Sequence, residues 1–262
     1  MRFGLCTSDL TRIDRLDRIG FDYVDVGARA LVPFASEREF APIRERLRSA
    51  PVRTEALGGF IPGNVKVVGP SVDWAQVRDY VEVTVGRAAE VGVEVINWGS
   101  AESRAVPPGY SFARAFEQLE RFCQLAADVA SRHRITIVIE GINPLECNVV
   151  YYVRDALHLA QTINRPEIRV LADYYHMVKQ SEPLDHLLEA GAWLQHAHTS
   201  DDERRLPSRR GFDQRRFLQY LKRAGYTGRL SLECRVAESF DEECAAAVAY
   251  LRELWETLDL RP

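Results

Sequence analysis

Four ionisable side chains stand at the ends of short apolar runs in the second half of the sequence. The runs are ITIVIE, RVLAD, QHAH and LSLE, and they end on Glu140, Asp173, His198 and Glu233. A charged group at the end of a buried strand is costly to desolvate unless it is paired or coordinates an ion. Taken singly, each residue could meet water or a surface arginine, but a shared cation accounts for all four. We therefore predict that they are the ligands of one metal ion.

The donor types of this set indicate which metal it would hold. Three carboxylates and one imidazole form a hard, mainly oxygen site. Such a site suits Mn²⁺ or Mg²⁺, with Co²⁺ as a further alternative, and it disfavours structural zinc. Because one donor is an imidazole, we expect Mn²⁺ as the cofactor.

Alternating strand and helix patterns predict the fold that positions these residues. Apolar, β-branched runs alternate with stretches of helical periodicity along the chain, which is typical of consecutive βα units. The eight predicted strands are residues 2–6, 23–26, 53–57, 93–98, 135–140, 168–173, 194–198 and 230–233. No glycine-rich phosphate loop follows the first strand, so an α/β fold with a closed (β/α)8 TIM barrel is favoured over an open doubly wound sheet. We expect residues 1–262 to form this single domain.

Helix signals support the same interpretation. Ser111 precedes apolar residues at helical spacing, and Gly20, Gly92 and Gly225 stand where helices should end before strands. A last helix over residues 240–258 would complete the eighth unit. Reactive residues of such barrels project from the C-terminal ends of the strands, so the four predicted ligands should meet at one mouth of the barrel.

The composition narrows the class of partner. Hydrophobic residues make up 46% of the chain, the net charge is -4, and the basic residues are scattered, so we expect a small polar substrate and no nucleic acid. The sequence has no apolar run of membrane-spanning length and no signal peptide at its start, and we expect a cytoplasmic protein that binds no membrane. Five cysteines without a CxxC pair are typical of reduced thiols.

Four segments resemble a known family: EGINPLE (140–146), DYYH (173–176), HTSDDER (198–204) and LECR (232–235). They are similar to the xylose isomerase-like TIM barrel superfamily of sugar phosphate isomerases and epimerases, and most of all to its ketose 3-epimerase branch, which includes D-tagatose and D-psicose 3-epimerases. The family pattern places a second Glu six residues after the first metal ligand, a His three after the Asp and an Arg six after the metal His. All seven positions match. The resemblance also suggests a homodimer or homotetramer.

The resemblance implies roles for three residues around the metal. Glu146 would bind the substrate, His176 would contact the sugar near its carbonyl, and Arg204 would bind substrate oxygens beside the metal. Each has a plainer alternative: a helix-entry charge, a core histidine in an aromatic run, and a solvated charge run at residues 201–205. The spacing from the metal ligands favours the functional roles.

Other residues are expected to support the site from outside the ligand set. His196 lies on the same side of its strand as His198, and we expect it behind the ligand rather than on the metal. Arg235 is expected to orient the Glu233 carboxylate. One of four aromatic residues is expected to form an apolar wall for the sugar: Phe60, Trp98, Tyr110 and Phe112.

The predicted chemistry is proton transfer beside a ketone, which needs a base over one face of the carbon and an acid over the other. We expect Glu140 and Glu233 to fill these roles while the metal acts as a Lewis acid on the enediolate oxygens. The predicted reaction is epimerisation of a ketose at C3. A non-phosphorylated sugar is favoured because no glycine-rich phosphate site follows the last two strands, although the arginines of residues 204–210 leave a phosphate possible.

Several rival functions stay open. A lyase of the same superfamily, such as an inosose dehydratase or a 3-keto-glycoside-cleaving enzyme, would use the same proton abstraction, and so would an aldose-ketose or hydroxypyruvate-type isomerase. The segments 60–74 and 98–111, which would set the substrate, leave the sugar unnamed. An apurinic-site nuclease would need more histidine ligands and a basic face, and the chain has six histidines in all. A barrel that merely binds a sugar is the last alternative.

Overall fold

A computed structural model describes residues 1–235 and 239–258. Its centre is a closed barrel of eight parallel strands in chain order, in which β1 also pairs with β8. The strands are β1 Arg2–Thr7, β2 Tyr23–Gly27, β3 Arg53–Gly58, β4 Val95–Trp98, β5 Thr136–Glu140, β6 Ile168–Asp173, β7 Leu194–Thr199 and β8 Arg229–Leu232. The predicted (β/α)8 TIM barrel is confirmed.

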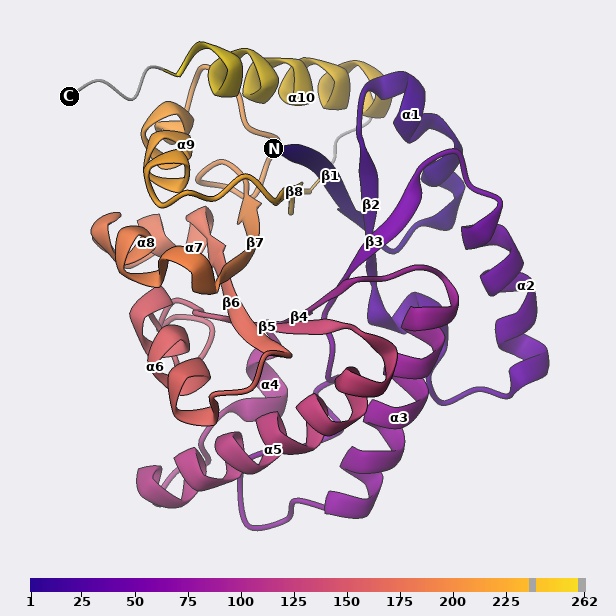
Figure 1. The fold of residues 1–262 in the computed structure, drawn as a ribbon, viewed down its shortest axis with the longest axis vertical. Coiled ribbons are helices and arrows are strands. Elements are labelled where there is room, and N and C mark those ends of the chain that lie inside the picture. The colour runs from indigo at the N-terminus through magenta and orange to yellow at the C-terminus, as the bar shows by residue number, and fades with distance from the viewer. Residues whose placement is uncertain (236–238, 259–262) are drawn as a thin grey trace.

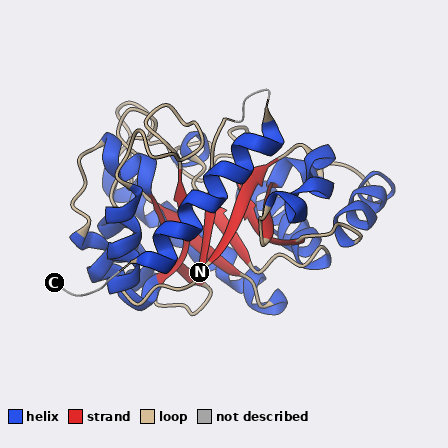
Figure 2. Cartoon of the chain, turned by 90° about the horizontal axis from the view of Figure 1, so that it is seen from above, coloured by secondary structure: helices blue, strands red, loops and turns tan. Residues whose placement is uncertain are grey.

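Helices surround the strands on the outside of the barrel (Figures 1 and 2). The α-helices are α1 Leu16–Ile19, α2 Glu37–Arg48, α3 Trp74–Glu90, α4 Ala101–Arg104, α5 Phe112–His133, α6 Val153–Ile163, α7 Tyr174–Lys179, α8 Asp185–Ala190, α9 Gln214–Arg223 and α10 Phe240–Thr257, with 3-10 turns η1 Leu10–Arg15, η2 Ala28–Leu31 and η3 Gly191–Trp193. The last helix, α10, contacts α1 and so completes the ring. None of the described helices is long and apolar enough to cross a membrane.

The helix ends follow the predicted signals. The Ser111 hydroxyl accepts a hydrogen bond from the N–H of Arg114 and caps α5. Gly20, Gly92 and Gly225 all have positive φ angles, as the predicted helix ends require. These capping residues set the lengths of the helices and thereby the points at which the chain returns to the barrel.

The strand bounds differ from the sequence prediction by one or two residues. β4 begins at Val95 rather than at residue 93, and β8 ends at Leu232 rather than on Glu233. The N–H of Glu233 still donates to the Thr199 carbonyl oxygen at 3.0 Å. Glu233 therefore stays within the hydrogen-bonding register of the barrel, one residue beyond its last strand.

The N-terminal ends of the strands are tied together by a buried carboxylate. The Glu55 side chain is fully buried, accepts from Nε of Arg229 at 2.7 Å and pairs with Arg2. These three residues belong to β3, β8 and β1, so the ion pairs span the seam where the first and last strands meet. The opposite, C-terminal end of the barrel carries the candidate site.

Candidate metal centre

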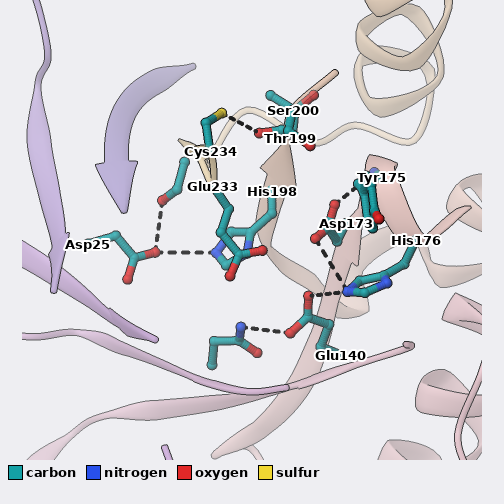
Figure 3. Close-up of polar contacts among 12 residues, drawn as sticks. Asp25, Glu140, Asp173, Tyr175, His176, His198, Thr199, Ser200, Glu233 and Cys234 are labelled. Carbon is teal, nitrogen blue, oxygen red and sulfur yellow. Dashed lines mark hydrogen bonds and ion pairs between the residues drawn. The ribbon is translucent and has the colours of Figure 1, made fainter. Parts of the chain in front are cut away.

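The four predicted ligands converge at the C-terminal mouth of the barrel. Glu140, Asp173, His198 and Glu233 each present one ligand-type atom, and these atoms all lie within 4.8 Å of one another. Figure 3 shows the side chains of β5, β6 and β7 facing Glu233, which comes from the end of β8. The first three residues are buried, and the side chain of Glu233 is 40% exposed. The spatial grouping expected from the sequence is present.

Asp173 is positioned by a helix as well as by its strand. It is the last residue of β6 and pairs in register with His198 of β7. Its Oδ1 accepts the N–H of Tyr175 at 2.8 Å and caps α7. Its Oδ2 faces Arg204 at 3.4 Å and His176 at 3.7 Å. One carboxylate oxygen therefore holds the helix, and the other is directed into the site.

The position of the Glu140 carboxylate depends on Gly99, which follows β4, and on Asn97, which lies within β4. A Cβ atom at Gly99 would lie 1.6 Å from Oε2 of Glu140, so this carboxylate requires glycine there. Nδ2 of Asn97 donates to the same Oε2 at 2.8 Å. Oε1 is buried without a hydrogen-bond partner among the described residues. Nε2 of His176 lies 3.8 Å from this Oε1.

An acidic residue that the sequence analysis did not identify, Asp25 of β2, lies behind His198. Its Oδ2 is 3.3 Å from Nε2 of His198 and 3.1 Å from Nε2 of His196, and it accepts from Ser231 at 2.9 Å. His196 thus contacts the same carboxylate as His198. It lies behind His198, where the sequence analysis expects it. A carboxylate inside the apolar run YVDVG is the signal that could have revealed Asp25.

The two histidines of β7 differ in their protonation. Burial lowers the pKa of His196 to about 4. Burial acts in the same direction on His198, but Asp25 and Glu233 outweigh it and raise the pKa of His198 well above its ordinary value. The proton on His198 places a positive charge among the carboxylates. A metal cation at this place would supply the same compensation.

The guanidinium of Arg204 lies between the carboxylates. It pairs with Glu233, and its Nη2 lies 3.0 Å from Nε2 of His176. Its guanidinium carbon is 4.0 Å from the centre of the Tyr175 ring. The Arg235 side chain is exposed, and none of the described hydrogen bonds or ion pairs joins it to Glu233, so its expected orienting role stays a prediction. Arg204 is the arginine on this carboxylate, since the loop after β7 turns back over the barrel mouth.

The other two predicted substrate residues adjoin Arg204. Nδ2 of Asn143 donates to Oε1 of Glu146 at 2.9 Å and lies 2.7 Å from Nδ1 of His176. Oε2 of Glu146 is 3.9 Å from Arg204. The side chain of Glu146 is 44% exposed, whereas that of His176 is buried. Asn143, which the sequence analysis did not single out, links the two.

The two glutamates of the centre have pKa values that are shifted in opposite directions. Burial, and then the neighbouring charge of Glu233, raise the pKa of Glu140 to about 6. The position of Glu233 inside the mouth also acts to raise its pKa, but His198 and Arg204 hold that pKa well below its ordinary value. The pair therefore has one readily protonated carboxyl and one persistent carboxylate.

The site is suited to a divalent cation. Oε1 of Glu140 and Nδ1 of His198 are buried without hydrogen-bond partners among the described residues, and both belong to the converging group. Three carboxylates and an imidazole match the preference of hard divalent ions for oxygen with one nitrogen. Glu140, Asp173, His198 and Glu233 can thus hold a metal.

A cavity of about 500 Å³ opens beside the centre. It borders His198 and Glu233, and the loops after β1 to β4 supply most of the rest of its wall. Of the four aromatic residues from which one wall residue was expected, Phe60 and Trp98 are fully buried and pack on Phe122 instead. Tyr110 and Phe112 are also not among the cavity's lining residues.

The arginines considered for phosphate binding lie elsewhere. Arg205, Arg209 and Arg210 border a second cavity of about 720 Å³, formed with α10. Arg205 pairs with Asp201, and Arg209 pairs with Glu253. These side chains therefore do not line the cavity beside the metal centre.

A closed parallel barrel with three carboxylates and a histidine gathered at its C-terminal mouth defines a TIM barrel protein with a candidate metal site there. The sequence profile of the xylose isomerase-like TIM barrel family matches residues 13–254. The chain belongs to this family.

Comparison with individual proteins gives relatives and structural neighbours. D-psicose 3-epimerase of Agrobacterium fabrum is 23% identical over 229 residues, which cover 84% of this chain and 77% of the relative. The structure of a D-psicose 3-epimerase in the presence of D-fructose superposes with a TM-score of 0.85 at 19% identity, covering 97% of this chain and 99% of that one. A 3-keto-D-glucoside 4-epimerase from E. coli superposes with a TM-score of 0.81 at 18% identity, with the same coverage. At these identities the superpositions establish a common fold.

Proposed function

We propose that the protein is a divalent-metal-dependent epimerase that inverts C3 of a non-phosphorylated ketose. The observation that carries the proposal is the placement of two glutamates, Glu140 and Glu233, in one ligand group beside a cavity. The relative and the neighbours are sugar epimerases, and the chain is an enzyme of this isomerase and epimerase type.

The proposed reaction moves one proton off a carbon beside a ketone and returns one to its other face. Glu140 comes from β5 and Glu233 from the end of β8, so the two carboxylates approach the barrel mouth from different sides. We assign the removal of the proton to one of them and its return to the other, through an enediolate. The bound metal, with Mn²⁺ as the expected ion, would supply Lewis acidity.

Three further residues would orient the sugar. His176 is buried, so it is placed to hydrogen-bond an oxygen at the carbonyl end of the substrate. Nη1 of Arg204 faces both Asp173 and Glu233, and the guanidinium would bind oxygens of the developing enediolate. Glu146 is half exposed and would accept a hydrogen bond from a sugar hydroxyl. Their mutual distances of 3.0–4.0 Å support a common role.

The positions of the arginines support a substrate without a phosphate group. Among the described residues that border the cavity beside the centre, Arg29 is the single arginine. Arg205 and Arg209 are engaged with acidic side chains outside it. A phosphate site of the barrel type would have donors gathered at the ends of the last strands.

A second candidate is a reaction on a 3-keto-glycoside, as an epimerisation or an elimination. It is favoured by the structural similarity to the 3-keto-D-glucoside 4-epimerase. Both candidates begin with the removal of a proton beside a ketone, so the products distinguish them.

The test is to incubate the Mn²⁺-loaded protein with ketoses, inososes and 3-keto-glycosides in D2O and to follow the products by NMR. The proposal expects one ketose pair to interconvert, with solvent deuterium entering at C3 alone. Release of water or an aglycone would assign a lyase instead. Interconversion of an aldose with a ketose would assign an isomerase, and turnover of 3-keto-glycosides alone would support the second candidate.

A further inference from the structure

A second group of ligand-type atoms lies on the far side of His198. Atoms of Cys6, Asp25 and His198 all lie within 4.8 Å of one another. Cys6 of β1 and Asp25 of β2 are direct neighbours in the register of the two strands. All three residues border the cavity beside the metal centre. The group is therefore accessible to a small ion from the cavity.

One oxygen of Asp25 is directed away from its hydrogen bonds. His196, His198 and Ser231 all contact Oδ2. Oδ1 is buried and has no hydrogen-bond partner among the described residues, although Asp25 is only 1% exposed. A Cβ atom at Gly58, which also borders the cavity, would lie 3.5 Å from this Oδ1. A buried carboxylate oxygen without a partner is costly unless a cation binds it.

The imidazole of His198 faces both groups. Its Nδ1 is 3.8 Å from Oε2 of Glu233, on the side of the carboxylate-rich centre. Its Nε2 is 3.3 Å from Oδ2 of Asp25, on the side of Cys6. A neutral ring binds one metal through either nitrogen, and a ring that has lost both N–H protons, an imidazolate, can bind one ion through each. One histidine can thus serve two adjacent ions.

We propose that Cys6, Asp25 and His198 form a second metal site that takes a thiophilic divalent ion such as Zn²⁺. Thiolate, carboxylate and imidazole are the donors that zinc prefers, and three protein ligands leave the fourth tetrahedral position open toward the cavity. Binding releases to solvent the proton of the Cys6 thiol and any proton on Nε2 of His198, and the thiolate and the Asp25 carboxylate together balance the charge of the ion. The carboxylate-rich centre offers no sulfur among its four ligands, so the two sites differ in metal preference.

The site is tested by anaerobic titration of the metal-free protein with Co²⁺ alone, since a Co²⁺–thiolate bond gives a charge-transfer absorption that oxygen and nitrogen ligands lack. The wild type should bind a second equivalent of Co²⁺ with this absorption, and added Zn²⁺ should abolish it. Cys6→Ser should lose both the absorption and the second equivalent. Cys234→Ser is the matched control, because Cys234 directly follows Glu233 and is also partly exposed, and it should retain both.

Asp173→Asn separates this site from the carboxylate-rich centre. The asparagine oxygen can still accept the N–H of Tyr175 that caps α7, so the fold should be kept. This variant should lose Co²⁺ at the first centre and keep the sulfur absorption. The proposal is overturned if folded wild type shows no such absorption at saturating Co²⁺, or if the absorption survives in Cys6→Ser. Neither result depends on enzyme activity, so the proposed function stands or fails separately.

Discussion

The two halves of the barrel mouth carry different groups. The four ligand-type residues lie at or next to the C-terminal ends of strands β5 to β8, and Arg204, from the loop after β7, makes ionic contacts with the carboxylates. The ends of β1 to β4 and the loops after them instead surround the cavity, and glycine recurs there at Gly27, Gly58, Gly59 and Gly63. One half concentrates charge, and the other provides space.

The difference shows how a barrel can separate reactivity from substrate shape. The charged half is held in place by hydrogen bonds that reach across from the open half. Asn97 donates to Glu140, and Asp25 contacts His198. The reactive groups should therefore be sensitive to changes in both halves, whereas the choice of substrate should depend mainly on the open half.

The largest effect is expected from a change in the charged half. In the proposed mechanism Glu233→Gln removes a proton-transfer group and a metal ligand together, so kcat should fall by about 1,000-fold. Bound Mn²⁺ should fall as well, as measured by elemental analysis after dialysis. Glu242→Gln, on the exposed face of α10, should leave both unchanged. If Glu233→Gln retains its metal and its turnover, the proposed mechanism is wrong.

A change in the open half should weaken the charged half from a distance. Asn97→Ala removes the donor to Glu140, and Mn²⁺ affinity should fall by about 10–100-fold, as measured by titration calorimetry. Asn148→Ala is the control, since Asn148 bonds the backbone of Val106 rather than the centre. Equal affinities for the two variants would mean that the halves are not coupled through Asn97.

The metal-free protein should reveal the cost of the buried Glu140 charge. Its pKa is raised to about 6, so near pH 5 the native state binds more protons than the unfolded state, and stability falls as pH rises through this range. Glu140→Gln has no ionisable group at this position, so its stability should not show this fall. Its free energy of unfolding relative to wild type should rise by about 1 kcal/mol between about pH 5 and about pH 7.

Urea denaturation in a chelator measures this difference, with Glu256→Gln on exposed α10 surface as the control. Saturating Mn²⁺ should reverse the order, because the ion stabilises the ionised carboxylate. A difference that does not change with pH would contradict the raised pKa of Glu140.

The smallest effect is expected at the cavity wall. A Cβ atom at Gly63 would lie 2.0 Å from Oε2 of Glu102, so Gly63→Ala must displace that side chain. Because both residues border the cavity and neither belongs to the ligand group, KM should change a few-fold with kcat unchanged. Gly86→Ala, where α3 leaves space for a methyl group, is the control. A fall in kcat alone would place Gly63 with the charged half.

The sequence predicted the barrel and the converging residues because both follow from local patterns. Strand periodicity is local, and a charged residue at the end of an apolar run stands out without any knowledge of its neighbours. Asp25 lies inside its apolar run and not at its end, so the same pattern does not single it out. The partner of Glu233 could not be predicted, since the return of the Arg204 loop over the mouth depends on tertiary packing. The burial of Trp98 against Phe122 in the core likewise depends on tertiary packing.

The seam between β1 and β8 has a consequence for the order of folding. Residues 2–5 pair with residues 229–232, and Glu55 links both strands at the base. During synthesis the first strand must wait for almost the whole chain before its second neighbour exists. The closing strand also brings Glu233, so the centre is completed in the same late step that removes the last open edge of the sheet. A nascent chain of this protein should be unable to bind its metal with full affinity before the barrel closes.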